Sequence, residues 1–221
     1  MFITFLLVML VATLVLFVIT SLEVERIERH HYLQRADFFA AHPLQPGEIA
    51  FLGDSLTAGG NWDEVFPELS IKNRGINADT TTGLLKRMDC VTRGQPAAIF
   101  ILIGTNDLPW YVYRHDELIL GTYQEILEKI RHDSPSTRVF VESILPRGHD
   151  CAERIRRLNP KLKELAEVFE YEYIDLYPRF ANKKGELRAD LNNDHLHLLA
   201  PGYELWAEAL RPYLRALFHQ Q

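Results

Sequence analysis

The sequence predicts an α/β fold, a three-layer α/β/α sandwich around a five-stranded parallel sheet, preceded by an N-terminal transmembrane helix. Short apolar runs bounded by turn residues alternate with amphipathic helical patterns about five times. This alternation indicates parallel strands joined by right-handed crossovers, with helices on both faces of the sheet. The apolar runs do not alternate with polar residues, which indicates strands that are buried on both faces.

The N-terminal segment is the strongest apolar run of the chain. No charged residue occurs from Phe2 to Ile19, and only Thr4 and Thr13 interrupt the run. As a helix it would span about 27 Å, close to the roughly 30 Å of a bilayer core. A signal peptide is the alternative, but a basic start and a small-residue cleavage site are missing. We therefore expect residues 1–21 to be an uncleaved single-pass membrane anchor.

The side of the membrane on which the rest of the chain lies is left open by the sequence. Arginines follow the apolar run and none precedes it, which favours the cytoplasmic side. Glutamates stand among these arginines, however, and weaken that signal. Residues 22–47 are predicted to form a stalk or linker helix, which ends in the Pro- and Gly-containing stretch HPLQPGE. Residues 48–221 are predicted to form the folded domain.

The remaining elements follow in order along the chain. Turn residues, prolines and apolar spacing set their expected limits. A proline at position 160 should kink or restart its helix, and Pro201 suits the first turn of the last one. The predicted strands cover residues 49–52, 70–73, 97–103, 138–145 and 171–176, and the predicted helices cover 81–92, 117–131, 152–170 and 202–218, with a short helix or turn ended by Pro67.

Composition excludes several classes of protein. The formal net charge is -6 and no basic stripe is evident, so the chain is not expected to bind nucleic acid. Neither a GxGxxG nor a GxxxxGK[ST] motif occurs, and we expect no cofactor. Cys90 and Cys151 are too few for a disulfide framework and are expected to be free thiols, although one bridge stays possible.

Polar residues that suit a hydrolase follow the predicted strands. Loops after parallel strands share one edge of the sheet, where ligands bind. Ser55 follows the first strand, and Asp194 and His197 lie in the loop before the last helix. A serine hydroxyl needs a base to take its proton and a third group to orient that base. Ser55 could alternatively be only part of a helix cap.

The same edge offers candidate donors for an oxyanion. Acyl transfer develops a negative charge that hydrogen-bond donors must meet. The second loop contains Asn73, Gly75 and Asn77, and the third contains Asn106. The Gly75 amide and the Asn106 side chain are the candidates, although glycine and asparagine also serve ordinary turns.

Four blocks in this order resemble the GDSL lipase/esterase family, also called SGNH hydrolases. They are GDSLTAGG at 53–60, NRGINADTT at 73–81, IGTND at 103–107 and DHLH at 194–197. The resemblance implies a flavodoxin-like fold, Ser55 as nucleophile, His197 as general base and then acid, and Asp194 as its orienting partner. It also implies an oxyanion hole of the Ser55 and Gly75 backbone amides and the Asn106 side chain. Asp54 and Asp107 are expected to stabilise loops rather than to react. Ala78 stands at a position where many members of the family have glycine.

Several alternatives stay open at this point. His195 could be the base in place of His197, whereas metal binding by His195, His197 and Asp194 is disfavoured because no further ligand motif occurs. Trp110, Tyr111 and Tyr113 could line a substrate pocket or contact the membrane. The expected activity is hydrolysis of an acyl ester, short-chain or acetyl, of a lipid or carbohydrate. A non-catalytic glycan- or protein-binding module and an acyltransferase with the same residues are the alternatives, and neither the natural substrate nor the oligomeric state follows from the sequence.

Overall fold

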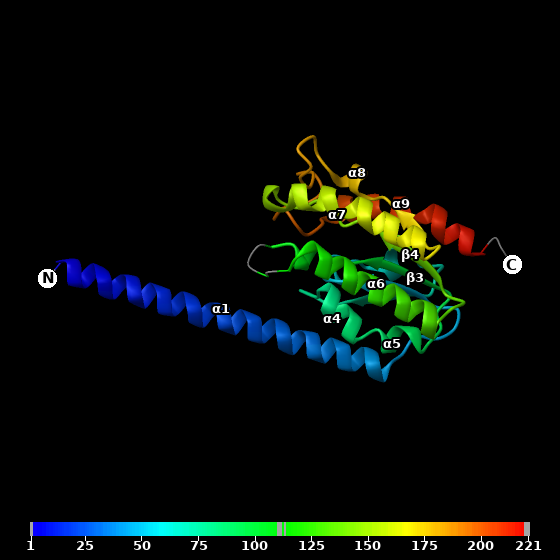
Figure 1. Ribbon diagram of the computed structural model, residues 1–221, viewed down its shortest axis with the longest axis horizontal. Coiled ribbons are helices and arrows are strands. Elements are labelled where there is room, and N and C mark those ends of the chain that lie inside the picture. The colour runs from blue at the N-terminus through cyan, green and yellow to red at the C-terminus, as the bar shows by residue number, and fades with distance from the viewer. Residues whose placement is uncertain (1, 110–111, 113, 219–221) are drawn as a thin grey trace.

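The fold is a five-stranded parallel sheet with helices on both faces, which confirms the predicted fold class. A computed structural model describes residues 2–109, 112 and 114–218 (Figure 1). The strands lie in the order β2-β1-β3-β4-β5, and every neighbouring pair is parallel. Their bounds are β1 Ile49–Gly53, β2 Ile71–Gly75, β3 Ala98–Leu102, β4 Arg138–Glu142 and β5 Glu172–Ile174.

Helices connect the successive strands along the chain, as the alternation of strand and helix patterns in the sequence predicted. Two small elements, α2 and η1, follow β1 and β3 directly at the carboxyl edge of the sheet. The bounds are α1 Phe2–Ala41, α2 Ser55–Ala58, α3 Trp62–Val65, α4 Thr81–Lys86, α5 Asp89–Thr92, η1 Thr105–Asp107, α6 Asp116–Asp133, α7 His149–Val168, α8 Tyr177–Phe180 and α9 Ala200–Phe218.

Two hydrophobic clusters fill the space on either side of the sheet. The first packs alternate strand residues against α4, α6 and α7, with Leu84, Ile126 and Ile155 fully buried. The second packs the other strand residues against α3 and α9, with Trp62 and Trp206 in edge-to-face contact. Strands buried on both faces explain why the apolar runs of the sequence are continuous.

The apolar N-terminal run and the predicted stalk form one continuous helix, α1. Its residues from Thr4 onward include an apolar stretch long enough to cross a membrane, and none of that stretch is buried. The far end of α1 packs on the sandwich: Phe39 is fully buried, and the Tyr32 hydroxyl donates a hydrogen bond to the Gly83 carbonyl. The boundary between stalk and domain at residues 47 and 48 stays a prediction.

Two helices differ from their predictions. The predicted helix 81–92 is divided into α4 and α5, because Arg87 between them turns inward to the buried Asp79. Helix α7 continues through Pro160, so the helix does not restart there, and the alternative of a kink stays a prediction. The neighbouring Asn159 side chain hydrogen-bonds both the N–H and the carbonyl of Ile144, which anchors this turn of α7 beside the end of β4.

Candidate active site

Ser55, His197 and Asp194 form a hydrogen-bonded chain at the carboxyl edge of the sheet. Ser55 is the first residue of α2, immediately after β1, and its Oγ lies 3.0 Å from His197 Nε2. His197 Nδ1 lies 2.6 Å from Asp194 Oδ2. If Nδ1 carries the proton and donates to Asp194, Nε2 is free to accept the proton of Ser55. The structure thus brings together Ser55 and His197, which lie 142 positions apart in sequence.

The loop around Asp194 fixes the orientation of the carboxylate. Asp194 Oδ1 accepts hydrogen bonds from the backbone amides of Leu196 and His197. Partial burial raises the pKa of Asp194, but the His197 ring and these two amides outweigh it, so the pKa lies below its usual value. Asp194 is therefore ionised near neutral pH and can stabilise a positive charge on His197. The two side chains are 46% and 47% exposed, which leaves the imidazole accessible to a substrate.

Short helix α2 is held in place by groups from three other elements. The Asn73 amide of β2 donates to the carbonyls of Thr57 and Ala58, and Trp62 Nε1 donates to the Thr57 carbonyl. The Tyr203 hydroxyl of α9 donates to the Leu56 carbonyl. Trp62 and Tyr203 were not predicted as site residues, since an isolated aromatic residue in sequence gives no sign that it bonds a distant turn. Together these bonds fix the backbone that carries Ser55.

Asp54, next to Ser55, caps α2 from a fully buried position. Its Oδ1 accepts a hydrogen bond from the Leu56 amide, and within the described residues its Oδ2 has no partner. Burial raises the pKa of Asp54 to about 7, against the lowering effect of the Leu56 amide. The predicted loop-holding role of Asp54 agrees with this cap.

Asn106 is tied to the loop after β2. Its Nδ2 donates to the Asp79 carbonyl at 2.9 Å, which uses one of its two amide protons. The Asp79 carboxylate forms a buried ion pair with Arg87, and Arg87 also donates to the Gly53 carbonyl. The loops after β1, β2 and β3 are thus joined through hydrogen bonds, and the second amide proton of Asn106 has no partner among the described residues.

Asp107 joins the same loops from the other side. Its carboxylate accepts hydrogen bonds from the backbone amide and the hydroxyl of Thr81, at the start of α4. Arg114 forms an ion pair with the same carboxylate at 3.3 Å. The expectation that Asp107 holds a loop agrees with these contacts.

Gly75 does not present its amide to Ser55. It is the buried last residue of β2, and its N–H donates to Asn73 Oδ1 at 3.0 Å. A Cβ at Gly75 would lie 2.3 Å from the Ala58 amide, so glycine is required there by close backbone approach. The expectation that the Gly75 amide is free for an oxyanion is therefore corrected: this amide already has a partner.

Ala78 lies in the loop between β2 and α4 and has a positive φ angle. Its φ is 58°, in the left-handed region that favours glycine, which gives a physical reason for the glycine that relatives carry at this position. Ala78 is exposed, lines a cavity together with Asn106, and has no backbone hydrogen bond to any residue in the described ranges. Among the described residues, the backbone N–H groups of Ala78 and of its neighbour Asn77 have no hydrogen-bond partner, and Ala78 is the one of the two that lines the cavity with Asn106.

The structure separates the two neighbouring histidines of the DHLH block. The backbone N–H of His195 donates to Asn192 Oδ1, whereas the His197 ring lies between Ser55 and Asp194. Across the described part of the chain, three or more His, Cys, Asp or Glu side chains do not cluster in a way that could hold a metal ion. Both cysteines are buried and free. Trp110, Tyr111 and Tyr113 lie outside the described residues.

Two cavities are lined in part by residues of the candidate site. One of about 420 Å³ is lined by Arg147, Asp194 and His195 among others. The other, of about 960 Å³, lies between helix α1 and the loops that carry Ala78 and Asn106. The smaller cavity therefore borders the candidate site at Asp194, and the larger one borders it at Asn106.

Comparisons with known proteins assign the family. The profile of the GDSL-like lipase/acylhydrolase family matches residues 51–205. The chain belongs to this family. A Bos taurus relative, platelet-activating factor acetylhydrolase IB subunit alpha1, is 29% identical over 184 residues, which cover 78% of this chain and 77% of the relative.

Solved structures of GDSL-like hydrolases agree in fold. A Streptococcus pneumonia protein whose description refers to platelet activating factor has a TM-score of 0.75 and 27% identity, and the match covers 88% of this chain and 99% of that one. A GDSL-like lipase from Bacteroides thetaiotaomicron has a TM-score of 0.73 and 20% identity, with coverage of 84% and 97%. The fold of this chain is therefore that of GDSL hydrolases.

Proposed function

We propose that this chain is a membrane-anchored serine esterase that hydrolyses short acyl or acetyl esters through an acyl-enzyme. The observation that carries the proposal is the hydrogen-bonded chain from Ser55 Oγ through His197 to Asp194. Membership of the GDSL-like lipase/acylhydrolase family supports the same reaction class. The exposed apolar stretch of α1 supports the anchor.

In the proposed mechanism Ser55 is the nucleophile and His197 transfers the proton. Ser55 Oγ attacks the ester carbonyl carbon while its proton passes to His197 Nε2. Asp194 stabilises the imidazolium that forms, because its carboxylate is held ionised against Nδ1. His197 then gives the proton to the departing alkoxide, the bond to the alcohol breaks, and the acyl group stays on Ser55. Water, deprotonated by His197, releases the acid in the second half of the reaction.

The proposed oxyanion donors are the Ser55 backbone amide, the free amide proton of Asn106 and the backbone amide of Ala78. Asn106 and Ala78 line the same cavity, and a second Asn106 proton already fixes the side chain on the Asp79 carbonyl. Ala78 takes the place that the sequence had assigned to Gly75, whose amide is bonded to Asn73. Donors that are fixed before the reaction stabilise the developing charge without reorganisation.

The proposed substrate class is an acyl ester with a small acyl group. The relatives at 26 to 29% identity are acetylhydrolases by name, which favours an acetyl ester. Attachment to a membrane favours a lipid over a freely soluble sugar ester. No metal or cofactor is required by the proposed chemistry, since a serine, a histidine and a carboxylate carry every proton transfer.

Labelling with a fluorophosphonate probe tests the proposal. The wild-type chain should form a covalent adduct at Ser55, whereas Ser55→Ala should take no label and lose turnover of p-nitrophenyl acetate. A wild-type chain that takes no label, under conditions where a known serine esterase is labelled, would favour a non-catalytic binding module. Product analysis with an added alcohol separates hydrolysis from transfer of the acyl group.

A further inference from the structure

Helix α1 forms one wall of the larger cavity beside the candidate active site. On the α1 side the cavity of about 960 Å³ is lined by residues that include Thr20, Val24 and Glu28. On the opposite side it is lined by Ala78 and Asn106, two of the proposed oxyanion donors. The helix that carries the apolar span therefore also bounds the approach to the reacting centre.

The lining residues of α1 form a single stripe. They share one face of the helix because each is three or four positions from another: Phe17, Thr20, Ser21, Val24, Glu25 and Glu28. Leu22 lies within this range of the helix and is not among the lining residues. The cavity is thus lined by one face of α1 and not by all of its apolar residues.

The position of this stripe along α1 relates the cavity to the depth of a bilayer. Residues 2–22 as a helix span about 30 Å, the thickness of a bilayer hydrocarbon core. The stripe begins inside that span at Phe17 and continues for about 16 Å to Glu28, beyond the first charged residues. With the apolar span inserted, the cavity straddles the boundary between the hydrocarbon core and the headgroups.

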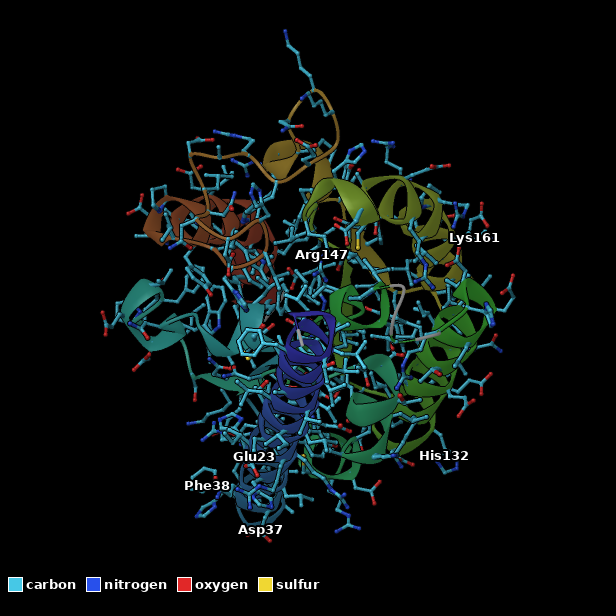
Figure 2. The ribbon with its side chains drawn as sticks, turned by 90° about the vertical axis from the view of Figure 1, so that its left-hand side faces the viewer. Glu23, Asp37, Phe38, His132, Arg147 and Lys161 are labelled. Carbon is cyan, nitrogen blue, oxygen red and sulfur yellow. The ribbon has the colours of Figure 1, made fainter. Side chains whose placement is uncertain are left out.

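The carboxyl edge of the sheet, which carries the candidate active site, faces the side on which the N-terminal half of α1 projects. Figure 1 shows the N-terminal half of α1 projecting past the sandwich at the end where α4 and α7 begin, which is the carboxyl edge of the strands. In Figure 2, seen from that side, α1 points toward the viewer and the labelled Arg147, from the loop after β4, lies above it. A bilayer around the apolar span would therefore face Ser55 and His197.

We propose that the active site faces the bilayer and takes its ester substrate, a membrane lipid, directly from the membrane that anchors the chain. The inference rests on the proposed function and names the substrate class of that same site. The ester groups of lipids lie between acyl chains and headgroups, at the height of this cavity. The cavity also changes from apolar lining at Phe17 and Val24 to acidic lining at Glu25 and Glu28, which suits a molecule with an apolar chain and a polar head.

The test compares two substitutions on α1 in the full-length protein, reconstituted in phosphatidylcholine vesicles. Val24→Trp places a bulky side chain in the cavity, and Leu22→Trp is the matched control at nearly the same height on another face. Both wild-type side chains are exposed, at 55% for Val24 and 60% for Leu22, so neither substitution disrupts a packed core. The readout is the rate on platelet-activating factor in the vesicles divided by the rate on dissolved p-nitrophenyl acetate.

We expect Val24→Trp to lower this ratio by about tenfold or more, the effect of one misfitting group in a binding site, and Leu22→Trp to leave it unchanged. Equal effects of the two variants, or no effect of Val24→Trp, would overturn the inference. It is also overturned if wild type hydrolyses p-nitrophenyl acetate but cleaves neither platelet-activating factor nor lysophosphatidylcholine in vesicles. Loss of both activities in wild type, with no label at Ser55, rejects the proposed function instead.

Discussion

At the scale of single residues, the geometry distinguishes two histidines that are two positions apart. His197 bridges Ser55 and Asp194, whereas the described hydrogen bonds of His195 involve its backbone and Asn192. His197→Ala should lower kcat/KM for p-nitrophenyl acetate by on the order of 10³-fold or more, as for other members of a triad. His195→Ala should lower it far less. Similar losses in the two variants would contradict the assignment of the base.

Asn106 gives a second residue-scale prediction. Asn106→Ala should lower kcat by roughly 10²-fold with little change in KM, because an oxyanion donor acts in the transition state. The side chain also bonds the Asp79 carbonyl, so the melting temperature of the variant must be measured alongside. A rise in KM with kcat unchanged would show instead that Asn106 serves ground-state binding.

Glu142, buried beneath the sheet edge, predicts a dependence of stability on pH. Burial raises its pKa to about 8, although Trp206 Nε1 donates a hydrogen bond to its carboxylate. Because of this raised pKa, Glu142 loses its proton at a lower pH in the unfolded chain than in the folded chain. The free energy of unfolding should therefore fall as pH rises from about 4.5 toward 8, by about 1.4 kcal/mol per pH unit for one proton.

The variant Glu142→Gln isolates this contribution from that of other acids such as Asp54. The glutamine oxygen can still accept the Trp206 hydrogen bond, but the side chain carries no titrating proton. Urea unfolding at several pH values should show a smaller loss of stability for the variant than for wild type over this window. Parallel curves for the two proteins would show that Glu142 does not titrate with a raised pKa.

Side chains of the candidate site can be picked out from the sequence more readily than the backbone groups that would serve as donors. Ser55, Asp194, His197 and Asn106 lie in distinctive sequence blocks. In the structure Ser55 is within hydrogen-bonding distance of His197, and His197 is within hydrogen-bonding distance of Asp194. The Gly75 prediction failed because the partner of an amide depends on the local path of the chain. That Asn73 Oδ1 accepts the Gly75 proton, and that Ala78 has a positive φ, cannot be read from residue types alone.

At the scale of elements, the end of α1 behaves as part of the folded sandwich. Phe39 is fully buried between the guanidinium groups of Arg35 and Arg74, whereas its neighbour Phe38 is 48% exposed. Phe39→Ala should lower the free energy of unfolding by about 3–5 kcal/mol, the cost of removing a buried aromatic side chain. Phe38→Ala is the matched control and should cost much less in urea unfolding. Equal costs would mean that this end of α1 does not dock as described.

Helix periodicity explains why α1 was predicted and why its docking was not. The apolar run and the following charged pattern both indicate a helix, and they form one. Which residues of that helix enter the core depends on its contacts with Gly83 and Arg74, which come from separate parts of the chain. The division of α4 from α5 has the same origin, since the inward turn of Arg87 is set by the distant partners Asp79 and the Gly53 carbonyl.

At the scale of the whole molecule, α1 has two parts that should separate in a truncation series. In the first part, the side chains of residues 4–7 and 9–22 are exposed. At the end of the second part Phe39 is buried in the core, as is Leu44 just after the helix. A chain that begins at residue 23 should keep the melting temperature of the full chain and its turnover of p-nitrophenyl acetate. It should no longer sediment with phosphatidylcholine vesicles, because the apolar span is gone.

A chain that begins at residue 48 should behave differently, although it starts at the predicted domain boundary. It lacks Phe39 and Leu44, and the loss of two buried side chains should lower the melting temperature by roughly 10 °C or more. Arg74 would also lose its carbonyl partner at His42. Thermal unfolding of the two truncated chains checks both expectations. If the shorter chain is as stable as the longer one, the docked end of α1 is not part of the folding unit and the boundary at residue 48 holds.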